Sequence, residues 1–375
     1  MRVLHAALMA NYEPGVLRQM EWENSAAREL GLIWASRLYC PVRTDTEVSS
    51  CVVPARGLGT VSNGSFAERA RRWVKLRKGY YAWLKEESAK YDLVMLRHSM
   101  ADPLRIAYVS TSRIPVLSVH HTMELSELAG RKGFQGTTKA ILERVIGRQS
   151  LARVSGIVGV TNEIRKYELA RAGIDLPSFV YPNGIDLADF RCEGGSVSDG
   201  TKPELIFVAG HFSHWHGLDL LLDSVEASSA DFVLNLVGRL SEADRRRAER
   251  DRRIVCHGLC SADEVRAVTE RCHVGLSSFA LQRMGMEEAC TLKVREYLAY
   301  GLPVFSGYTD VFPDDFKFYR KGKASIEDIL AYAREVSGFD KKNVALAASR
   351  YTSKKSILER FYHELIDADL ALVRR

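Results

Sequence analysis

The 375-residue sequence lacks any long apolar run, and no stretch approaches the roughly 20 apolar residues of a membrane-spanning helix. Its opening, MRVLHAALMANYEPG, has a short apolar run that Asn11, Glu13 and Pro14 interrupt. This pattern is typical of a first buried strand and not of a signal peptide. We therefore expect a cytoplasmic protein, either free or peripheral at the inner face of the cell membrane.

Cysteine is also scarce, and its spacing excludes a disulfide framework because the number is odd and the positions are scattered. The five residues Cys256, His257, Cys260, Cys272 and His273 suggest zinc ligands, but two of the pairs fall on predicted buried strands rather than on loops. We therefore expect no metal. The seven cysteines are Cys40, Cys51, Cys192, Cys256, Cys260, Cys272 and Cys290.

The charge is only mildly positive, +6 over the whole chain. A nucleotide diphosphate, an anionic lipid or another phosphate-bearing partner fits this value. No recognised base-reading module accompanies the charge, so nucleic acid is not an expected partner.

Short apolar runs alternate with helical patterns along the whole chain, which is typical of parallel sheets covered by helices. We expect an α/β protein, and the length favours two domains. Residues 193–203, EGGSVSDGTKP, indicate a linker between domains at 1–192 and 204–352. Residues 353–375 have apolar side chains at helical spacing and predict a terminal helix.

Residues 286–307, MEEACTLKVREYLAYGLPVFSG, predict an anion site. A helix that begins near Thr291 would carry Lys293 in its first turn, beside the unpaired backbone N–H groups of Thr291, Leu292 and Lys293. The helix dipole and the ammonium group would both stabilise a diphosphate. Glu288 before the helix and Glu296 inside it can accept hydrogen bonds from sugar and nucleoside hydroxyls. The alternative is a solvated helix start with ordinary charged residues.

These residues carry a family resemblance. Glu288 and Glu296 have the E-x7-E spacing of retaining GT-B glycosyltransferases of the group 1 or family 4-like type, and TLKVREYLAYGLPV is similar to that family's helix segment. The run VYPNGIDLADF, residues 180–190, resembles the segment that ends its N-terminal domain. The resemblance implies the GT-B fold, with two Rossmann-like domains facing each other across a cleft. It also implies that the terminal helix packs back toward the N-terminal domain.

The resemblance implies a retaining, metal-independent hexosyltransferase without a cofactor. Its donor would be a nucleotide-diphosphate sugar, with UDP or GDP as the favoured nucleotide. The acceptor would be a glycan or a lipid-linked glycan in surface polysaccharide or glycoconjugate assembly. The leaving diphosphate would help to take the acceptor proton, so no enzymatic nucleophile is required. The expected catalytic residues are His120, Glu288 and Lys293, and the expected donor-binding residues are Gly15, His211, His216, Thr291, Leu292, Lys293 and Glu296.

Four of these residues are assigned by their position in the family. Relatives place an Arg and a Lys against the diphosphate where this chain has His211 and His216, so we hypothesise that activity weakens as these histidines lose their protons. Gly15 is the candidate for the loop after the first strand. His120 follows the strand-like run PVLSV, where α/β ligand sites form, although His120 and His121 could equally be core or loop histidines with satisfied hydrogen bonds.

Residues 65–85, SFAERARRWVKLRKGYYAWLK, combine six basic residues between Arg69 and Lys78 with several aromatic ones. The segment fits a membrane-surface helix that would bring Trp73 and Arg77 to an acceptor or lipid. It fits equally well an amphipathic helix that packs on a sheet with a solvated basic face.

Two rival functions remain open from the sequence. A nucleotide-sugar epimerase or hydrolase on the same fold would not need an acceptor. A non-catalytic sugar- or nucleotide-binding protein is the other alternative, because paired α/β domains also close around ligands in binding proteins.

Overall fold

The computed structural model describes residues 1–11, 13–42, 49–55, 57–58, 65–129, 134–195 and 202–368. The chain divides into two compact units. Unit 1 comprises Met1–Pro182 together with the chain from Ile357 onward, and unit 2 comprises Asn183–Ser356. Residues 196–201 of the expected linker and residues 369–375 of the expected terminal helix lie outside the described residues.

Unit 1 is built on a seven-stranded sheet in the order β3-β2-β1-β4-β5-β6-β7, in which every neighbouring pair is parallel. Its strands are short and almost entirely apolar because helices cover both faces of the sheet. They are β1 (Val3–Leu8), β2 (Trp34–Cys40), β3 (Val52–Pro54), β4 (Leu93–Arg97), β5 (Val116–His120), β6 (Gly156–Gly159) and β7 (Ser178–Val180).

Successive side chains of each strand point to opposite faces, and each face has its own hydrophobic cluster. Leu4 and Ala6 of β1 pack with α2, α3, α5 and α6, whereas Val3 packs with α1 and α13. The helices of unit 1 are α1 (Pro14–Glu29), α2 (Phe66–Ser88), α3 (Pro103–Thr111), α4 (Glu124–Ala129), α5 (Phe134–Leu151), α6 (Asn162–Ala172) and α13 (Lys354–Asp367).

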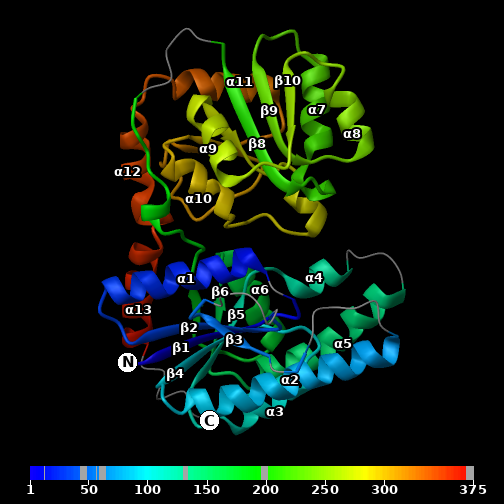
Figure 1. The fold of residues 1–375 in the computed structure, drawn as a ribbon, viewed down its shortest axis with the longest axis vertical. Helices are drawn as coiled ribbons and strands as arrows, with labels where there is room; N and C mark the ends of the chain where they lie inside the picture. The colour runs from blue at the N-terminus through cyan, green and yellow to red at the C-terminus, as the bar shows by residue number, and fades with distance from the viewer. Residues whose placement is uncertain are drawn as a thin grey trace. The chain divides into compact units, whose positions relative to one another are not determined.

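Helix α13 packs against the N-terminal elements of unit 1. Phe361 and Leu365 of α13 are buried against Val3 and Trp34, and in Figure 1 this red helix lies beside the blue N-terminal elements. The Tyr362 hydroxyl accepts a hydrogen bond from the Met1 ammonium group at 3.1 Å. The expectation that the terminal helix packs back on the N-terminal part is therefore confirmed.

Unit 2 repeats the plan of unit 1 with a six-stranded parallel sheet in the order β10-β9-β8-β11-β12-β13. One face packs against α7, α8 and α11, and the other face packs against α9, α10 and α12. The strands are β8 (Glu204–His211), β9 (Val233–Arg239), β10 (Ile254–Gly258), β11 (Val274–Leu276), β12 (Val304–Ser306) and β13 (Tyr319–Lys321). The helices are α7 (Leu218–Ala227), α8 (Glu242–Ala248), α9 (Ala262–Arg271), α10 (Leu292–Ala299), α11 (Ile326–Glu335) and α12 (Lys341–Thr352).

The two sheets have the same doubly wound strand order, which reverses between β1 and β4 in unit 1 and between β8 and β11 in unit 2. In such folds ligands bind outside the carboxyl ends of the strands at the point of reversal. The expected two Rossmann-like units are confirmed. Within the described ranges, no helix is both long enough and apolar enough to cross a membrane.

Candidate functional site

The carboxyl ends of β8 and β11 in unit 2 gather most of the residues that the sequence predicts for donor binding. The β8–α7 loop contains a short 3-10 helix, His214–His216, and the β11–α10 loop contains another, Leu281–Met284. The backbone N–H of Phe279 donates to the His216 carbonyl at 2.9 Å. Arg283 donates to the His214 carbonyl at 2.7 Å and pairs with Asp219. These bonds hold the two loops together.

Gly217 allows this close approach. Its φ of +69° is left-handed, and a Cβ at this position would lie 3.0 Å from both the Ala280 nitrogen and the Phe279 Cβ. Any other residue would therefore strain the backbone and push the loops apart. Helix α7 begins directly after this glycine.

Lys293 is the most informative residue of the site. Its ammonium nitrogen is buried and has no hydrogen-bond partner among the described residues. It lies 5.5 Å above the centre of the Phe207 ring. Burial lowers the pKa of Lys293 to about 8, although the charge of Glu296 opposes this shift. A buried cation without a partner is costly, so this position favours an anionic ligand.

The N-terminus of α10 is left open to such a ligand. Thr291 occupies the N-cap, but its side chain does not cap the helix. Its hydroxyl instead lies 2.9 Å from the Tyr308 hydroxyl, which in turn lies 2.9 Å from the Ser277 hydroxyl. The helix start expected near Thr291 is therefore confirmed, and Thr291, Leu292 and Lys293 form its uncapped first turn.

Glu288 and Glu296 lie on the two sides of Lys293 along the chain. Glu288 forms an isolated parallel bridge with Thr309, and the backbone of Ala289 donates to the Thr309 carbonyl at 3.0 Å. Glu296 lies one turn beyond Lys293 in α10 and is partly buried. Both residues therefore lie close in the chain to the helix start that carries Lys293, Glu288 before it and Glu296 within it.

Arg295 is a residue of this site that the sequence analysis missed. It is fully buried and makes two 2.6 Å hydrogen bonds to Asp310, and its Nε donates to the Asn183 carbonyl at 3.2 Å. Asn183 also donates from its side chain to the Cys290 carbonyl at 2.7 Å. Arg295 therefore fixes the segment that enters unit 2 against the start of α10. A charged residue within an otherwise apolar helix face was the available signal.

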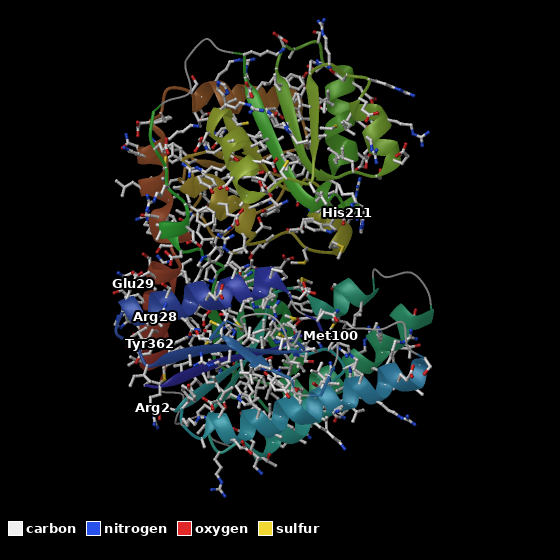
Figure 2. The ribbon with its side chains drawn as sticks, viewed as in Figure 1. Arg2, Arg28, Glu29, Met100, His211 and Tyr362 are labelled. Carbon is white, nitrogen blue, oxygen red and sulfur yellow. The ribbon has the colours of Figure 1, made fainter. Side chains whose placement is uncertain are left out.

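The hypothesis about the two histidines needs a correction at His216. This ring is buried, it stacks on Trp215 with centroids 3.7 Å apart, and its Nδ1 accepts a hydrogen bond from the Ser213 backbone. Burial and the nearby Lys293 charge lower the pKa of His216 to about 3. The ring is therefore neutral at physiological pH and does not replace the missing cation. His211, labelled in Figure 2, is exposed at the end of β8.

In unit 1, His120 is the last residue of β5 and belongs to a buried network of charged residues. Its Nε2 lies 2.7 Å from the Ser118 hydroxyl, and its Nδ1 lies 3.0 Å from Glu124. Arg105 donates to the same Ser118 oxygen at 2.7 Å. Both ring nitrogens of His120 are thus engaged by the protein.

His98 follows β4 and extends this network, and its ring stacks on that of His120 with centroids 4.6 Å apart. His98 pairs with Glu143 at 2.9 Å, and Arg171 bridges Glu143 at 2.6 Å and Glu168 at 2.7 Å. The sequence analysis missed these residues because charged residues on α5 and α6 are typical of solvated helix faces. The available signal in the sequence was Gly147, a glycine within α5. The structure explains it, because a Cβ at this position would collide with Glu143 and Arg171.

The pKa values of the network residues reflect their burial and the hydrogen bonds and charges of their neighbours. Burial lowers the pKa of both His98 and His120 to about 4. Burial alone would raise the pKa of Glu143, but hydrogen bonds from His98, Ala101 and Arg171 bring it to about 2. Burial raises the pKa of Glu168 to about 7, with a contribution from the charge of Glu124.

His120, Glu124 and Glu168 are the group, within the part of the chain that the structure describes, whose donor atoms lie close enough to hold a metal ion. They differ from the cysteines and histidines that the sequence singled out. Cys256, for example, is exposed on β10 and not buried as expected. The guanidinium of Arg171 already neutralises Glu168, and Nδ1 of His120 already pairs with Glu124. A divalent cation would have to displace these bonds.

The remaining predicted residues lie on α1 and α2. Gly15 lies in the first turn of α1 and not in a loop, and a Cβ there would meet only open space. The Arg77 guanidinium lies 3.9 Å above the Trp73 ring and donates to Asp102 at 3.1 Å. Asp102 caps α3, so Arg77 is held by the fold of unit 1.

Comparisons with known proteins agree with this architecture. Residues 37–189 match the family model described as Glycosyltransferase Family 4. No curated protein matches the chain.

Several solved structures are similar over nearly the whole chain. The lipopolysaccharide outer core galactosyltransferase WaaB in its apo form has a TM-score of 0.64 at 13% identity, covering 98% of this chain and 100% of that one. Sucrose-phosphate synthase from Thermosynechococcus elongatus has a TM-score of 0.64 at 16% identity, with the same coverage. HepE from Anabaena in complex with UDP has a TM-score of 0.60 at 12% identity, again covering 98% and 100%. These similarities show that the chain has the GT-B fold.

Proposed function

We propose that the protein is a retaining glycosyltransferase that moves a hexose from a nucleotide-diphosphate sugar to a glycan or lipid-linked acceptor. The observation that carries the proposal is the buried Lys293 ammonium group, which has no partner in the described residues and lies at the uncapped start of α10. A diphosphate would supply the missing negative charge. The similarity to HepE, whose solved structure contains UDP, supports a nucleotide of this class.

Each donor group has a candidate partner in unit 2. Lys293 and the N–H groups of Thr291, Leu292 and Lys293 bind the diphosphate, and Glu296 accepts hydrogen bonds from the nucleoside hydroxyls. Glu288 accepts from the hydroxyls of the transferred sugar. We assign this donor function to residues 204–352.

The two histidines contribute without a fixed charge. Because Nδ1 of His216 accepts from Ser213, its proton lies on Nε2, and the neutral ring can still donate a hydrogen bond to a phosphate oxygen. His211 is exposed at the end of β8 and supplies a second polar contact.

The proposed reaction needs no enzymatic nucleophile and no metal. The bond between the anomeric carbon and the diphosphate breaks, and the acceptor hydroxyl forms its new bond on the same face of the sugar. The leaving diphosphate takes the hydroxyl proton. Lys293 and the α10 dipole stabilise the negative charge that develops on the leaving group, which is the largest contribution expected from the protein.

We assign the acceptor to residues 1–192, with a role in surface polysaccharide or glycoconjugate assembly at the inner face of the cell membrane. In the same unit, His120 at the end of β5 is proposed as a catalytic residue and Gly15 at the start of α1 as a donor-binding residue. Because both nitrogens of His120 are engaged, its ring reaches a ligand only if Ser118 or Glu124 releases it. The similarity to a lipopolysaccharide galactosyltransferase supports this class of acceptor.

Thermal unfolding with UDP, GDP and ADP and their common sugar conjugates, without added metal, tests the donor site. We expect one nucleotide to raise the unfolding midpoint, and Glu296→Ala and Lys293→Met to lose that rise. Lys323→Met is the matched control, because Lys323 is exposed in the same unit. Absence of stabilisation by every nucleotide would contradict the proposal.

Product analysis with the stabilising sugar nucleotide then separates the reaction classes. Transfer with retained anomeric configuration supports the proposal. Free sugar or an epimerised sugar nucleotide in the absence of an acceptor would instead identify a hydrolase or an epimerase. Binding without any product would identify a non-catalytic binding protein.

A further inference from the structure

Unit 1 contains a large groove that no residue of the proposed reaction uses. It lies between α2 and the β2–β3 edge of the sheet and has a volume of about 1040 Å³. This value is at the upper end of the roughly 300–1,000 Å³ found for small-molecule sites. The groove can therefore hold a long ligand.

The interior of the groove is apolar and aromatic. Its lining includes Tyr39, Val53, Leu58, Val74 and Trp83. The rings of Tyr39 and Trp83 lie 5.8 Å apart. Such a lining offers few hydrogen bonds to a sugar or a base, so an aliphatic ligand is the better match.

Helix α2 also carries Phe66 in its first turn, on the same face as Ala70 and Val74 of the groove lining. Phe66, Ala70 and Val74 follow one another at intervals of four residues and so share one face of the helix. All three are exposed, and Phe66 is 80% exposed at the first turn. An exposed phenylalanine at the end of an amphipathic helix is typical of a contact with the acyl region of a membrane.

The rim of the groove is positively charged. Among the described lining residues, Arg71, Lys75 and Lys78 are basic and Glu86 is acidic. Lys75 donates to the Gly57 carbonyl at 2.9 Å, whereas Arg71 and Lys78 have no ion pair to any residue that the structure describes. An apolar interior beneath two available cations is complementary to an acyl chain that carries an anionic headgroup.

We infer that this groove binds an anionic phospholipid of a membrane surface, with an acyl chain between Val74 and Trp83 and the phosphate at Arg71 and Lys78. The inference rests on the proposed location at a membrane surface and names the lipid class bound there. None of the proposed donor or acceptor residues is among the described residues that line the groove. A bilayer with anionic lipids supplies both the acyl chains and the negative surface charge.

Flotation of the full-length protein with vesicles tests the headgroup contact. Vesicles of phosphatidylglycerol and phosphatidylcholine should bind the protein, and vesicles of phosphatidylcholine alone should bind it at least tenfold less. The double variant Arg71→Glu, Lys78→Glu should lower binding to the anionic vesicles by at least tenfold. The control Arg246→Glu, Arg250→Glu makes the same charge change at exposed positions of unit 2 and should lower binding by less than threefold.

Fluorescence quenching tests the acyl contact separately. Vesicles whose phosphatidylglycerol has brominated acyl chains should quench the protein, and Trp83→Phe should remove at least half of that quenching without weakening flotation by more than about threefold. Thermal unfolding midpoints of the variants verify that they fold.

Three results would overturn the inference. The first is no binding to anionic vesicles. The second is equal loss of binding in the two charge-reversed double variants, which would indicate attraction by net charge alone. The third is quenching that does not depend on Trp83, which would place the acyl contact elsewhere.

Discussion

Both units have buried charged residues at the carboxyl ends of equivalent sheets, but among the described residues the charges are paired in unit 1 and that of Lys293 in unit 2 is not. In unit 1 the rings of His98 and His120 and the carboxylates of Glu143 and Glu168 are paired with one another or with Arg171. In unit 2 the ammonium group of Lys293 has no partner in the described residues. The charges of unit 1 are compensated within the network, although Nδ1 of His98 has no hydrogen-bond partner in the described residues. The buried ammonium group of Lys293 has no hydrogen-bonded counter-ion there, so an anionic ligand would stabilise it.

The difference separates a structural role from a binding role without reference to any relative. Polar residues of unit 1 that were expected at a ligand are held by neighbours on several elements, which fixes their positions. The ammonium group of Lys293 lies over the Phe207 ring but has no hydrogen-bond partner in the described residues, so it can still bind a ligand. The comparison therefore ranks Lys293 above His120 as the residue that contacts substrate.

Breaking the network of unit 1 should have the largest effect. Glu143→Ala removes the shared partner of His98 and Arg171 and the acceptor of the Ala101 backbone N–H. We expect unit 1 to lose about 3–5 kcal/mol of unfolding free energy, because Arg171 keeps only Glu168 as a buried partner and the Ala101 N–H and His98 lose their acceptor. Urea unfolding measures the loss, and the exposed Glu86→Gln serves as the control that should change stability by less than about 0.5 kcal/mol.

Removing the ammonium group of Lys293 should increase the unfolding free energy. Burial lowers the pKa of Lys293 from 10.5 to about 8, so its charge costs up to about 3 kcal/mol below pH 8. Lys293→Met should therefore raise the unfolding midpoint while it weakens nucleotide binding by roughly 30-fold or more. Calorimetric titration and thermal unfolding on the same samples measure both effects. A destabilised variant would mean that the ammonium group has a partner of its own.

The pH dependence of nucleotide binding should follow Lys293 and not His216. Since the pKa of His216 is about 3, affinity should stay constant between pH 6 and 7.5. Above pH 8 Lys293 loses its proton in the free protein, so affinity should fall by about tenfold by pH 9.5. Lys293→Arg should remove the alkaline fall, because a guanidinium stays charged. An acid-side change near pH 6.5 would restore the histidine hypothesis.

The smallest effect is expected at His216 itself. His216→Gln keeps a side-chain donor and removes only the stacked ring, so nucleotide affinity should fall by about threefold to tenfold. The same titration at pH 7 measures it. A loss as large as that of Lys293→Met would show that the ring carries charge in the complex.

The sequence was sufficient for two α/β units with parallel sheets and for the helix start near Thr291, because apolar alternation and helix-start signals are local patterns. It was not sufficient for the network around His120. Glu143 and Glu168 are separated from His98 by tens of residues, and only the fold brings them together beneath the ends of β4 and β5. The protonation state of His216 could not be predicted from the sequence either, because it depends on burial against Trp215 and on the charge of Lys293.

Unit 2, Asn183–Ser356, is a continuous insertion between the two parts of unit 1. The synthesis of unit 1 therefore begins before that of unit 2 but ends after it. Unit 2 can fold as soon as its last helix has left the ribosome. Unit 1 must wait for α13, whose Phe361 and Leu365 cover a face of the sheet that includes Val3. At roughly 5–20 residues per second the nascent chain therefore exposes this apolar face throughout the synthesis of unit 2, which makes it the expected contact for chaperones.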